Sequence, residues 1–403
     1  MTNRSLWVHN PVGQRADGVW VDHALRDAST SGGMTRNVAG RTIGPQQRIE
    51  VFRGHDAEND VNVSFYQRGW TDGFPVVAPT VSRVREMLCY ASESGQAVIA
   101  DLDPMRGQAT LEKIAANAVM AGCNPDYFPV VLAATRGIGH SDFNLRGVQM
   151  TDENVTPLLI ISGPIANDLD INAGIGALGP GWKANATIGR ALRLVMINIG
   201  GGWPGTGSLA GIGQPGRYTL CIGENIASSP WPGLQTECGF GPTDSVVTVL
   251  RAESCVNVTG GLAEIASAMG SAVSIFSVLH GGVVAVLLAP ATARGLVQAG
   301  WSKYDIQKYL FQNGRIPLEQ WRSFWVRQRI TPNYGLPQWV QEEETQQRPI
   351  PVVQTAKDIV VFVAGGEAPI PQHVYFATWG FPPCRLTLPI LQPASSTTKP
   401  ELK

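Results

Sequence analysis

The chain has little charge, no paired cysteines and no familiar metal-binding pattern. Charged residues make up 16% of its 403 residues and the formal net charge is −1, so nothing in the charge balance favours nucleic acid or an anionic membrane as a partner. Its six cysteines include no C-x-x-C pair, which excludes zinc-ribbon and thioredoxin-type motifs. Neither H-x-H nor H-E-x-x-H occurs. We therefore predict no metal site, unless ligands from distant positions meet in the fold.

Long apolar runs are also scarce. The N-terminal residues lack the apolar core of a signal peptide. The most hydrophobic stretch, 260–290, is interrupted by Glu264, His280, serines and paired glycines, which favours a buried helix followed by a buried strand over a membrane-spanning helix. The sequence predicts a cytoplasmic protein with no membrane partner.

Loop-forming residues are concentrated between residues 172 and 240. Three segments stand out there, N-A-T-I-G-R at 185–190, G-G-G-W-P-G at 200–205 and E-N-I-A-S-S-P-W at 224–231. Glycine, asparagine and proline at this density, flanked by apolar segments, indicate backbone shaped around a bound molecule. We place the predicted functional site in this region.

Apolar strands alternate with helices along the chain. Strands are expected at 157–162, 283–288 and 358–363, and helices at 81–90, 110–123, 185–199 and 302–312. This alternation predicts an α/β fold with a partly parallel (mixed) sheet, packed helices and long glycine-rich loops. The three strands end in glycine or proline turns, and ligands of open α/β sheets bind beyond such strand ends.

Composition divides the chain into five predicted parts. They are an extended N-terminal arm (1–60), the main α/β domain or domains (61–340), a surface linker (341–357), a C-terminal strand-containing segment (358–391) and a disordered tail (392–403). The long arm and the small-residue stripe of helix 110–123 both suit subunit packing, so we expect a homo-oligomer.

Three side chains are candidate catalytic groups. Glu224 follows an apolar run and opens an aromatic-bearing loop, a placement that suits general acid–base catalysis. His280 stands at a turn before a buried strand and acts either as a base or as a helix cap. Cys123 lies between two helical segments, so the amide end of the second would lower its thiol pKa, while the carbonyl end of the first would raise it. Cys123 is a nucleophile only if its thiol pKa is lowered.

Candidate binding residues surround these groups. Arg190 and Arg193 stand three apart on one helix and either clamp a carboxylate or face solvent. Gly201 and Gly202 either turn N–H groups toward an anion or cap the same helix. The predicted substrate-binding set is Arg190, Arg193, Asn185, Asn225, Gly201, Gly202 and Trp231.

Three segments carry a resemblance to a known family: T-D-G-F-P-V-V-A-P-T at 71–80, E-K-I-A-A-N-A-V-M-A-G-C at 112–123 and the segment 185–190. Over residues 66–390 the chain resembles a family of large bacterial hypothetical proteins associated with the small selenocysteine/cysteine proteins named for a U-G-S-C motif. The chain contains no Cys-Gly-Ser-Cys. The resemblance implies a bacterial, small-molecule-directed protein in which Cys123 and 185–190 match the family pattern, and it implies no particular activity.

Together these patterns lead to one main hypothesis and two alternatives. The segment 211–216 matches G-x-G-x-x-G, but no convincing strand precedes it and Pro215 interrupts it, so we predict no nucleotide or other organic cofactor. The main hypothesis is a cofactor-independent hydrolase or lyase acting on a small polar, carboxylated molecule. The alternatives are a thiol redox protein in which Cys123 reacts with a partner thiol or selenol, and a non-enzymatic binding or scaffold subunit.

Overall fold

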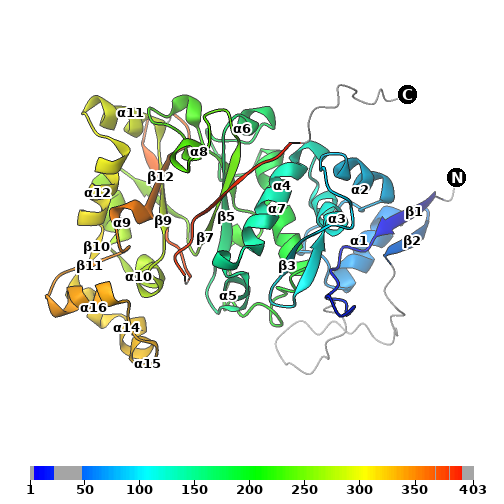
Figure 1. Ribbon diagram of the computed structural model, residues 1–403, viewed down its shortest axis with the longest axis horizontal. Helices are drawn as coiled ribbons and strands as arrows, with labels where there is room; N and C mark the ends of the chain where they lie inside the picture. The colour runs from blue at the N-terminus through cyan, green and yellow to red at the C-terminus, as the bar shows by residue number, and fades with distance from the viewer. Residues whose placement is uncertain (1–3, 22–47, 368, 381, 393–403) are drawn as a thin grey trace.

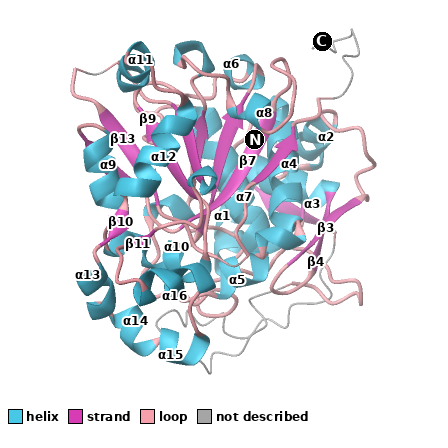
Figure 2. Ribbon diagram, turned by 60° about the vertical axis from the view of Figure 1, so that its left-hand side comes forward, coloured by secondary structure: helices cyan, strands magenta, loops and turns pink. Residues whose placement is uncertain are grey.

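Two four-stranded sheets lie face to face at the centre of the computed structural model, which describes residues 4–21, 48–367, 369–380 and 382–392. The first sheet has the spatial order β14 (Leu386–Pro389), β7 (Val246–Ala252), β5 (Thr156–Ser162) and β6 (Cys221–Gly223). The second has the order β8 (Val256–Thr259), β13 (Gln372–Phe376), β9 (Val284–Leu288) and β12 (Ile359–Val363). Helices cover the outer face of each sheet, which gives four layers (Figures 1 and 2).

Both sheets repeat one strand pattern. In each, one parallel pair is followed by two antiparallel neighbours, and the parallel pairs are β5 with β6 and β9 with β12. This confirms the predicted α/β fold with a mixed sheet. Strand β14 lies close to the C-terminus but pairs with β7 of the first sheet, so the last part of the chain crosses back to complete the first half.

Strand β5 shows why the predicted strands are continuously apolar. Leu158 and Ile160 pack between the two sheets, whereas Leu159 and Ile161 pack against the helices of the first outer layer. A strand that is buried on both faces has no position for a polar alternation. The same residue pattern in β9 and β12 places their side chains in the inter-sheet core and in the second outer layer.

The outer layers consist mainly of five helices. α3 (Leu111–Ala121), α4 (Phe128–Gly139) and α7 (Lys183–Asn198) cover the first sheet, and α9 (Leu262–Met269) and α12 (Lys303–Asn313) cover the second. All eleven residues of α3 are buried, because its alanines allow α7 and α2 (Val81–Leu88) to pack closely on it. Side chains cap two of these helices: Thr80 accepts from the Arg83 N–H at the start of α2, and Ser302 and Asp305 form a capping box at the start of α12.

The remaining elements are short or peripheral. The helices are α1 (Ala57–Gln67), α5 (Leu145–Met150), α6 (Ile165–Asp168), α8 (Leu234–Glu237), α10 (Ile275–His280), α11 (Pro290–Gln298), α13 (Leu318–Ser323), α14 (Trp325–Arg329), α15 (Thr331–Tyr334) and α16 (Gln338–Thr345). The strand pairs are β1 (Arg4–His9) with β2 (Ile49–Gly54), β3 (Val98–Leu102) with β4 (Gly107–Thr110), and β10 (Arg315–Ile316) with β11 (Ile350–Pro351).

The structure corrects two of the predicted chain divisions and shows where the strands of a third lie. The described part of the N-terminal arm packs into this chain's own core through Val8, rather than extending away from it. The predicted linker 341–357 contains the end of α16 and strand β11, and its Ile350 is fully buried. The segment 358–391 supplies strands to both sheets. The predicted tail, except for residue 392, lies outside the described residues.

The strand ends beyond which we expect a ligand to bind lie along one edge of the structure. Helices α6, α8 and α11 follow the carboxyl ends of β5, β6 and β9 along the upper edge in Figure 1, and α14 to α16 project at the lower left.

No single helix in the described part of the chain is long and apolar enough to cross a membrane. The helical segments Leu262–Met269 and Ala272–His280, which are bent by 59° relative to each other, meet the length and composition requirement only as a pair.

Candidate functional site

Glu224 lies where the parallel strand pairs of both sheets end. It is the residue after β6, and its N–H donates to Ile161 O at 2.8 Å, which extends the pairing with β5. The next N–H, that of Asn225, donates to Val363 O at 2.8 Å, at the end of β12 in the other sheet. The junction between the sheets therefore holds the Glu224 side chain, which is only 3% exposed.

The Glu224 carboxyl is incompletely hydrogen-bonded. Its Oε2 accepts from the Leu234 N–H at 2.9 Å, at the start of α8. The hydroxyl of Ser162, the last residue of β5, adjoins the same carboxyl. Neither Glu224 Oε1 nor Ser162 Oγ makes a well-aligned hydrogen bond within the described residues. Buried polar atoms without partners are rare in native proteins and commonly mark functional positions.

Burial raises the pKa of Glu224 above its usual value. Ser162, the Leu234 N–H and the Lys303 ammonium act in the opposite direction, but burial outweighs them. Lys303 lies on α12, in the outer layer of the other sheet, and forms an ion pair with Glu237 of α8. Glu224 therefore keeps its proton to a higher pH than an exposed glutamate, which is the property of a general acid.

Two predicted binding residues, Asn225 and Trp231, lie on the loop that follows Glu224 in the chain. The Asn225 Oδ1 accepts from the Ser228 N–H at 3.1 Å and so begins the short 3₁₀ turn Ile226–Ser228. Trp231 is half-buried and packs against the core beneath the second outer layer. Both side chains shape the loop that leads from Glu224 to α8.

Asn185 has a structural role. It lies inside α7, which begins at Lys183, two residues before the predicted start of this helix. Its Oδ1 accepts from the Asn172 N–H at 2.7 Å, and its Nδ2 donates to Asn172 O, Ala177 O and Cys221 O. A side chain with all these bonds is satisfied within the protein and holds the loop 172–177 beside β6.

Arg190 is also occupied within the protein. Its guanidinium donates to both carboxylate oxygens of Asp72 and to Pro75 O, and it lies 5.6 Å from the ring centroid of Phe74. The Asp72 side chain is 2% exposed. Because the buried carboxylate already takes the bidentate face of the guanidinium, Arg190 is not available to clamp a substrate.

Arg193 points elsewhere and has no acidic partner. It is 6% exposed, and it lines a small cavity together with Arg217 and Thr156, at the beginning of β5. Glu224 adjoins the opposite end of that strand, roughly 20 Å away at 3.3 Å per residue. Arg193 therefore cannot hold a substrate for Glu224.

The triple glycine ends α7 and presents no free N–H groups to an anion. The N–H groups of Gly201 and Gly202 donate to Ile197 O and Met196 O, at 3.0 and 3.1 Å. A Cβ at Gly202 would lie 1.6 Å from the side-chain oxygen of Gln149. The capping alternative is therefore the one that the structure shows, and these glycines permit close packing.

Cys123 is buried against α7. Its Sγ contacts Thr187 O at 3.3 Å, and burial raises the pKa of the thiol to about 12, despite smaller opposing effects of Lys183 and Arg190. It lines a cavity of about 200 Å³ that also contacts Arg83 and Lys183. A thiol with this pKa remains protonated at neutral pH, so the structure does not favour its use as a nucleophile.

His280 is the last residue of α10 and is followed by Gly281 in the left-handed conformation, with φ of 65°. Its ring lies near Phe276 and Trp379, with centroid distances of 6.2 and 5.3 Å. Burial, together with the charge of Arg251, lowers its pKa to about 4. The imidazole is therefore neutral at pH 7.

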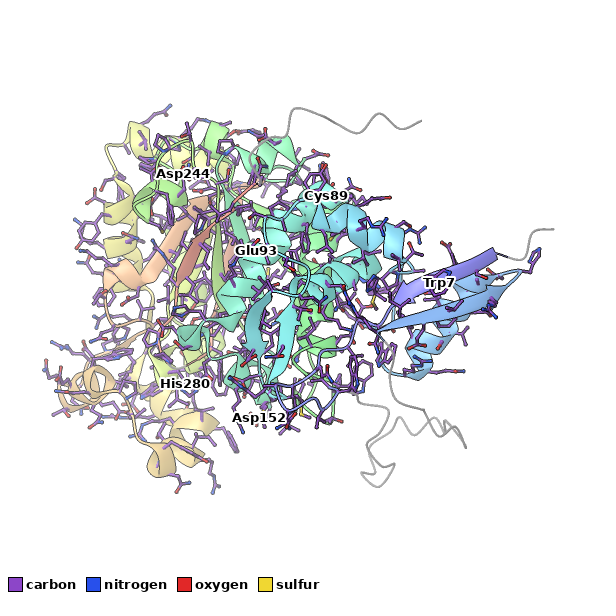
Figure 3. All side chains as sticks on the ribbon, turned by 45° about the vertical axis from the view of Figure 1, so that its right-hand side comes forward. Trp7, Cys89, Glu93, Asp152, Asp244 and His280 are labelled. Carbon is purple, nitrogen blue, oxygen red and sulfur yellow. The ribbon has the colours of Figure 1, made fainter. Side chains whose placement is uncertain are left out.

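The predicted catalytic residues do not form one site. Cys123 and Arg190 are neighbours on the outer side of α7, since Arg190 also approaches Ala121 O. Glu224 lies at the carboxyl edge of β6, whereas His280 precedes the amino end of β9 at the opposite edge. Figure 3 shows this separation: Asp244, on the edge that holds Glu224, and His280 are labelled at opposite ends of the sandwich.

The sequence analysis missed Ser162 and the pair Glu153–Glu253. Ser162 had a detectable signal, since it ends a predicted strand directly before a glycine–proline turn. The Glu153 and Glu253 carboxyls share a hydrogen bond, and burial together with the partner's charge raises the pKa of Glu253 to about 9. Glu253 follows β7, a strand not predicted, so no sequence signal indicated this pair.

His373 was not singled out either. It is fully buried, and its Nδ1 accepts from the Ala289 N–H at 3.1 Å. This places the ring proton on Nε2, which lies 3.0 Å from Gly260 O.

No group of three histidine, cysteine or acidic side chains within the described residues is placed to hold a metal ion. Comparison of the chain with protein-family models, curated proteins and solved structures found no match.

Proposed function

We propose that this chain is a cofactor-independent hydrolase or lyase acting on a small polar, carboxylated molecule, with Glu224 as the group that transfers the proton. One observation carries the proposal. At the edge where both parallel strand pairs end, the protein buries a carboxyl with a raised pKa and leaves one of its oxygens without a well-aligned hydrogen bond, beside the Ser162 hydroxyl. Such an arrangement is costly for stability and suits a catalytic acid or base.

Three nearby side chains have distinct roles in this proposal. Protonated Glu224 gives its proton to the leaving oxygen or nitrogen while water attacks, or its carboxylate removes a carbon-bound proton in an elimination. The Ser162 hydroxyl orients the carboxyl. Lys303, the cation that acts on Glu224, would hold the substrate carboxylate by exchanging it for its present partner, Glu237.

The test uses two defined sets of probes with the full-length protein. N-acyl amino acids report hydrolysis, and 2- and 3-hydroxy acids report elimination through the ultraviolet absorbance of the new double bond. We expect wild-type turnover in one set and a loss of at least about 100-fold in kcat for Glu224→Gln. Glu319→Gln is the matched control, because the Glu319 side chain is 88% exposed.

Two outcomes would overturn the proposal: the absence of wild-type turnover in both sets, and full activity of a folded Glu224→Gln variant. The thermal unfolding temperature of each variant shows whether it is folded. A pH–rate profile adds a second readout. Activity that needs the protonated acid should fall as pH rises through the pKa of Glu224, above the usual glutamate value.

A second candidate is the non-enzymatic binding or scaffold subunit. It is favoured by the separation of Glu224, His280 and Arg193, which leaves no cluster of the predicted catalytic groups. It predicts no turnover in either probe set. The thiol redox alternative has less support, because the Cys123 thiol is buried with a pKa of about 12.

Location and assembly complete the proposal. All six cysteines are unpaired, including the exposed Cys89 and Cys255, which fits a reducing compartment and therefore the cytoplasm. A homo-oligomer remains our prediction, and light scattering coupled to size exclusion would measure it. The resemblance to the large bacterial proteins related to U-G-S-C proteins also remains a prediction.

A further inference from the structure

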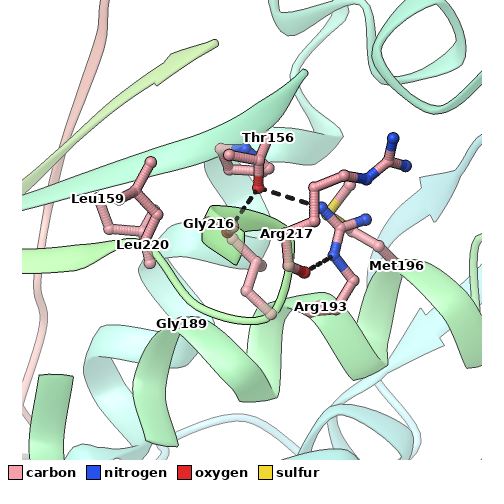
Figure 4. Close-up of a pocket in the computed structure, with 10 residues that line it drawn as sticks. Thr156, Leu159, Gly189, Arg193, Met196, Gly216, Arg217 and Leu220 are labelled. Carbon is pink, nitrogen blue, oxygen red and sulfur yellow. Dashed lines mark hydrogen bonds between the residues drawn. The ribbon is translucent and has the colours of Figure 1, made fainter. Parts of the chain in front are cut away.

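A second polar site lies at the other end of β5, between α7 and the loop that precedes β6. Its cavity measures about 10 Å³ and is lined by the residues drawn in Figure 4, among them Thr156, Arg193 and Arg217. This volume accommodates one small occupant, either a water molecule or a monatomic ion. The cavity lies roughly 20 Å from Glu224, which adjoins the far end of the same strand.

Two arginines line this cavity without an acidic partner. Arg193 is only 6% exposed. Its Nε donates to Arg217 O at 2.6 Å and its Nη2 donates to Thr156 Oγ1 at 3.1 Å (Figure 4). The Arg217 Nη2 donates to Ser208 Oγ at 2.7 Å, and its Nη1 is buried without a partner. Across the described ranges, no carboxylate lies within ion-pairing distance of either guanidinium.

This arrangement is electrostatically unfavourable as it stands. Burial and the neighbouring charge of Arg217 lower the pKa of Arg193 to about 9 against a smaller opposing effect of the Asp72 carboxylate, and burial lowers the pKa of Arg217. Removing one partner of a buried ion pair is strongly destabilising, because it leaves an uncompensated charge. Asp72 compensates the Arg193 charge only in part, because its carboxylate is already paired with Arg190. Arg217 is partly exposed, and within the described residues it has no ion-paired carboxylate. A neutral water would complete hydrogen bonds but would not compensate charge.

We infer that this cavity binds a small monovalent inorganic anion, such as chloride, between Arg193 and Arg217. The small volume favours a monatomic ion over an organic carboxylate or a tetrahedral phosphate, and the two guanidiniums supply the charge. The bound anion stabilises the packing of α7 against the loop 214–220. Helix α7 and this loop approach closely at Gly189, because a Cβ at that position would lie 2.3 Å from Thr219 Oγ1. This inference is independent of the proposed chemistry at Glu224.

Crystallography with bromide locates the anion directly. Wild-type crystals grown in sodium gluconate and soaked in sodium bromide should give an anomalous peak in the cavity between Arg193 and Arg217. Gluconate is too large to occupy the cavity. Bromide peaks confined to the protein surface, with none in the cavity, would overturn the inference. This readout needs no variant, so it stands even if substitution prevents folding.

Thermal unfolding measures the effect on stability. Chloride replaces gluconate at constant ionic strength, and the wild-type Tm should rise saturably, by about 2 °C or more, because only the folded state contains the site. Arg217→Gln should lose this increase. Arg146→Gln, which removes an exposed arginine on α5, should keep it. A wild-type Tm that does not depend on chloride, or an unchanged response in a folded Arg217→Gln variant, would contradict the inference.

Discussion

Arg190 holds the carboxylate of Asp72 in a bidentate ion pair, with Nε to Oδ2 at 2.7 Å and Nη2 to Oδ1 at 2.9 Å, across 118 positions of sequence. The same guanidinium donates to Pro75 O. These contacts join the segment 71–80 to α7. Because Arg190 also approaches Ala121 O, all three segments that carry the family resemblance meet in space, at a contact that supports the fold.

Breaking this pair should destabilise the protein strongly. Asp72→Asn or Arg190→Gln leaves one buried charge without its partner, so we expect the free energy of unfolding to fall by about 3 kcal/mol or more. Urea unfolding at pH 7 measures the loss. The exposed pair of Glu58 with Arg83 is the control, and Glu58→Gln should cost less than about 0.5 kcal/mol. Equal effects of the two substitutions would contradict the structural role.

Gly202→Ala should destabilise the end of α7. The added Cβ would lie 1.6 Å from Gln149 Oε1, while Gln149 Nε2 donates to Asp103 O and Met196 O. The side chain can move only by giving up these bonds, which predicts a loss of about 1–3 kcal/mol. Gly211→Ala, at a position with open space around it, is the matched control. Circular dichroism during thermal unfolding compares the two, and similar Tm values would refute the expected strain.

Glu253→Gln should change how stability depends on pH. The folded protein keeps the Glu253 proton up to a pKa of about 9, whereas the unfolded chain releases it near the usual glutamate pKa of 4.5. Between these values the wild type loses stability as pH rises, by up to about 1.4 kcal/mol per pH unit for one proton. Glutamine carries no charge, so the variant should gain stability relative to the wild type across this window.

The appropriate readout is the difference between variant and wild type. Burial lowers the pKa of Lys113 to about 7, and this group adds stability as pH rises above 7, which masks part of the Glu253 effect in the wild type alone. Urea unfolding at several pH values from 5 to 9 gives the difference. A difference that stays constant with pH would show that Glu253 is ionised throughout. Glu319→Gln should give that constant result.

Alkylation distinguishes the two roles considered for Cys123. Because its thiol is buried with a pKa of about 12, iodoacetamide at pH 8 should modify Cys123 far more slowly than the exposed Cys89. Peptide mass spectrometry resolves the two sites, and unfolding in urea should make their rates similar. Rapid modification of Cys123 in the folded protein would restore the thiol redox hypothesis.

Local patterns were sufficient for the elements whose signals lie within one segment. The strand at β5 and the helix α12 were both predicted; β5 is an apolar run and α12 begins with a capping box, and both signals act over a few residues. Strands β13 and β14 did not follow, because their stability depends on partners far along the chain rather than on their own periodicity.

The candidate site was predictable only in part. Glu224 was identified because a carboxylate directly after an apolar run stands at a strand end, and the structure places it at the junction of both sheets. Arg190 and Arg193 looked equivalent in sequence, three residues apart on one helix. Their surroundings differ completely, since Arg190 faces Asp72 and Arg193 faces Arg217.

Residue patterns along the chain were sufficient to predict an α/β fold with a mixed sheet, because burial on both faces of a strand and on one face of a helix leaves a regular apolar pattern. Which polar side chains are available depends instead on contacts made in the folded protein. The bonds that occupy Arg190, Asn185 and Gly202, and the burial that holds the Cys123 thiol protonated, come from residues distant in the chain. Charge compensation and desolvation depend on distance in space, which residue spacing along one chain does not contain.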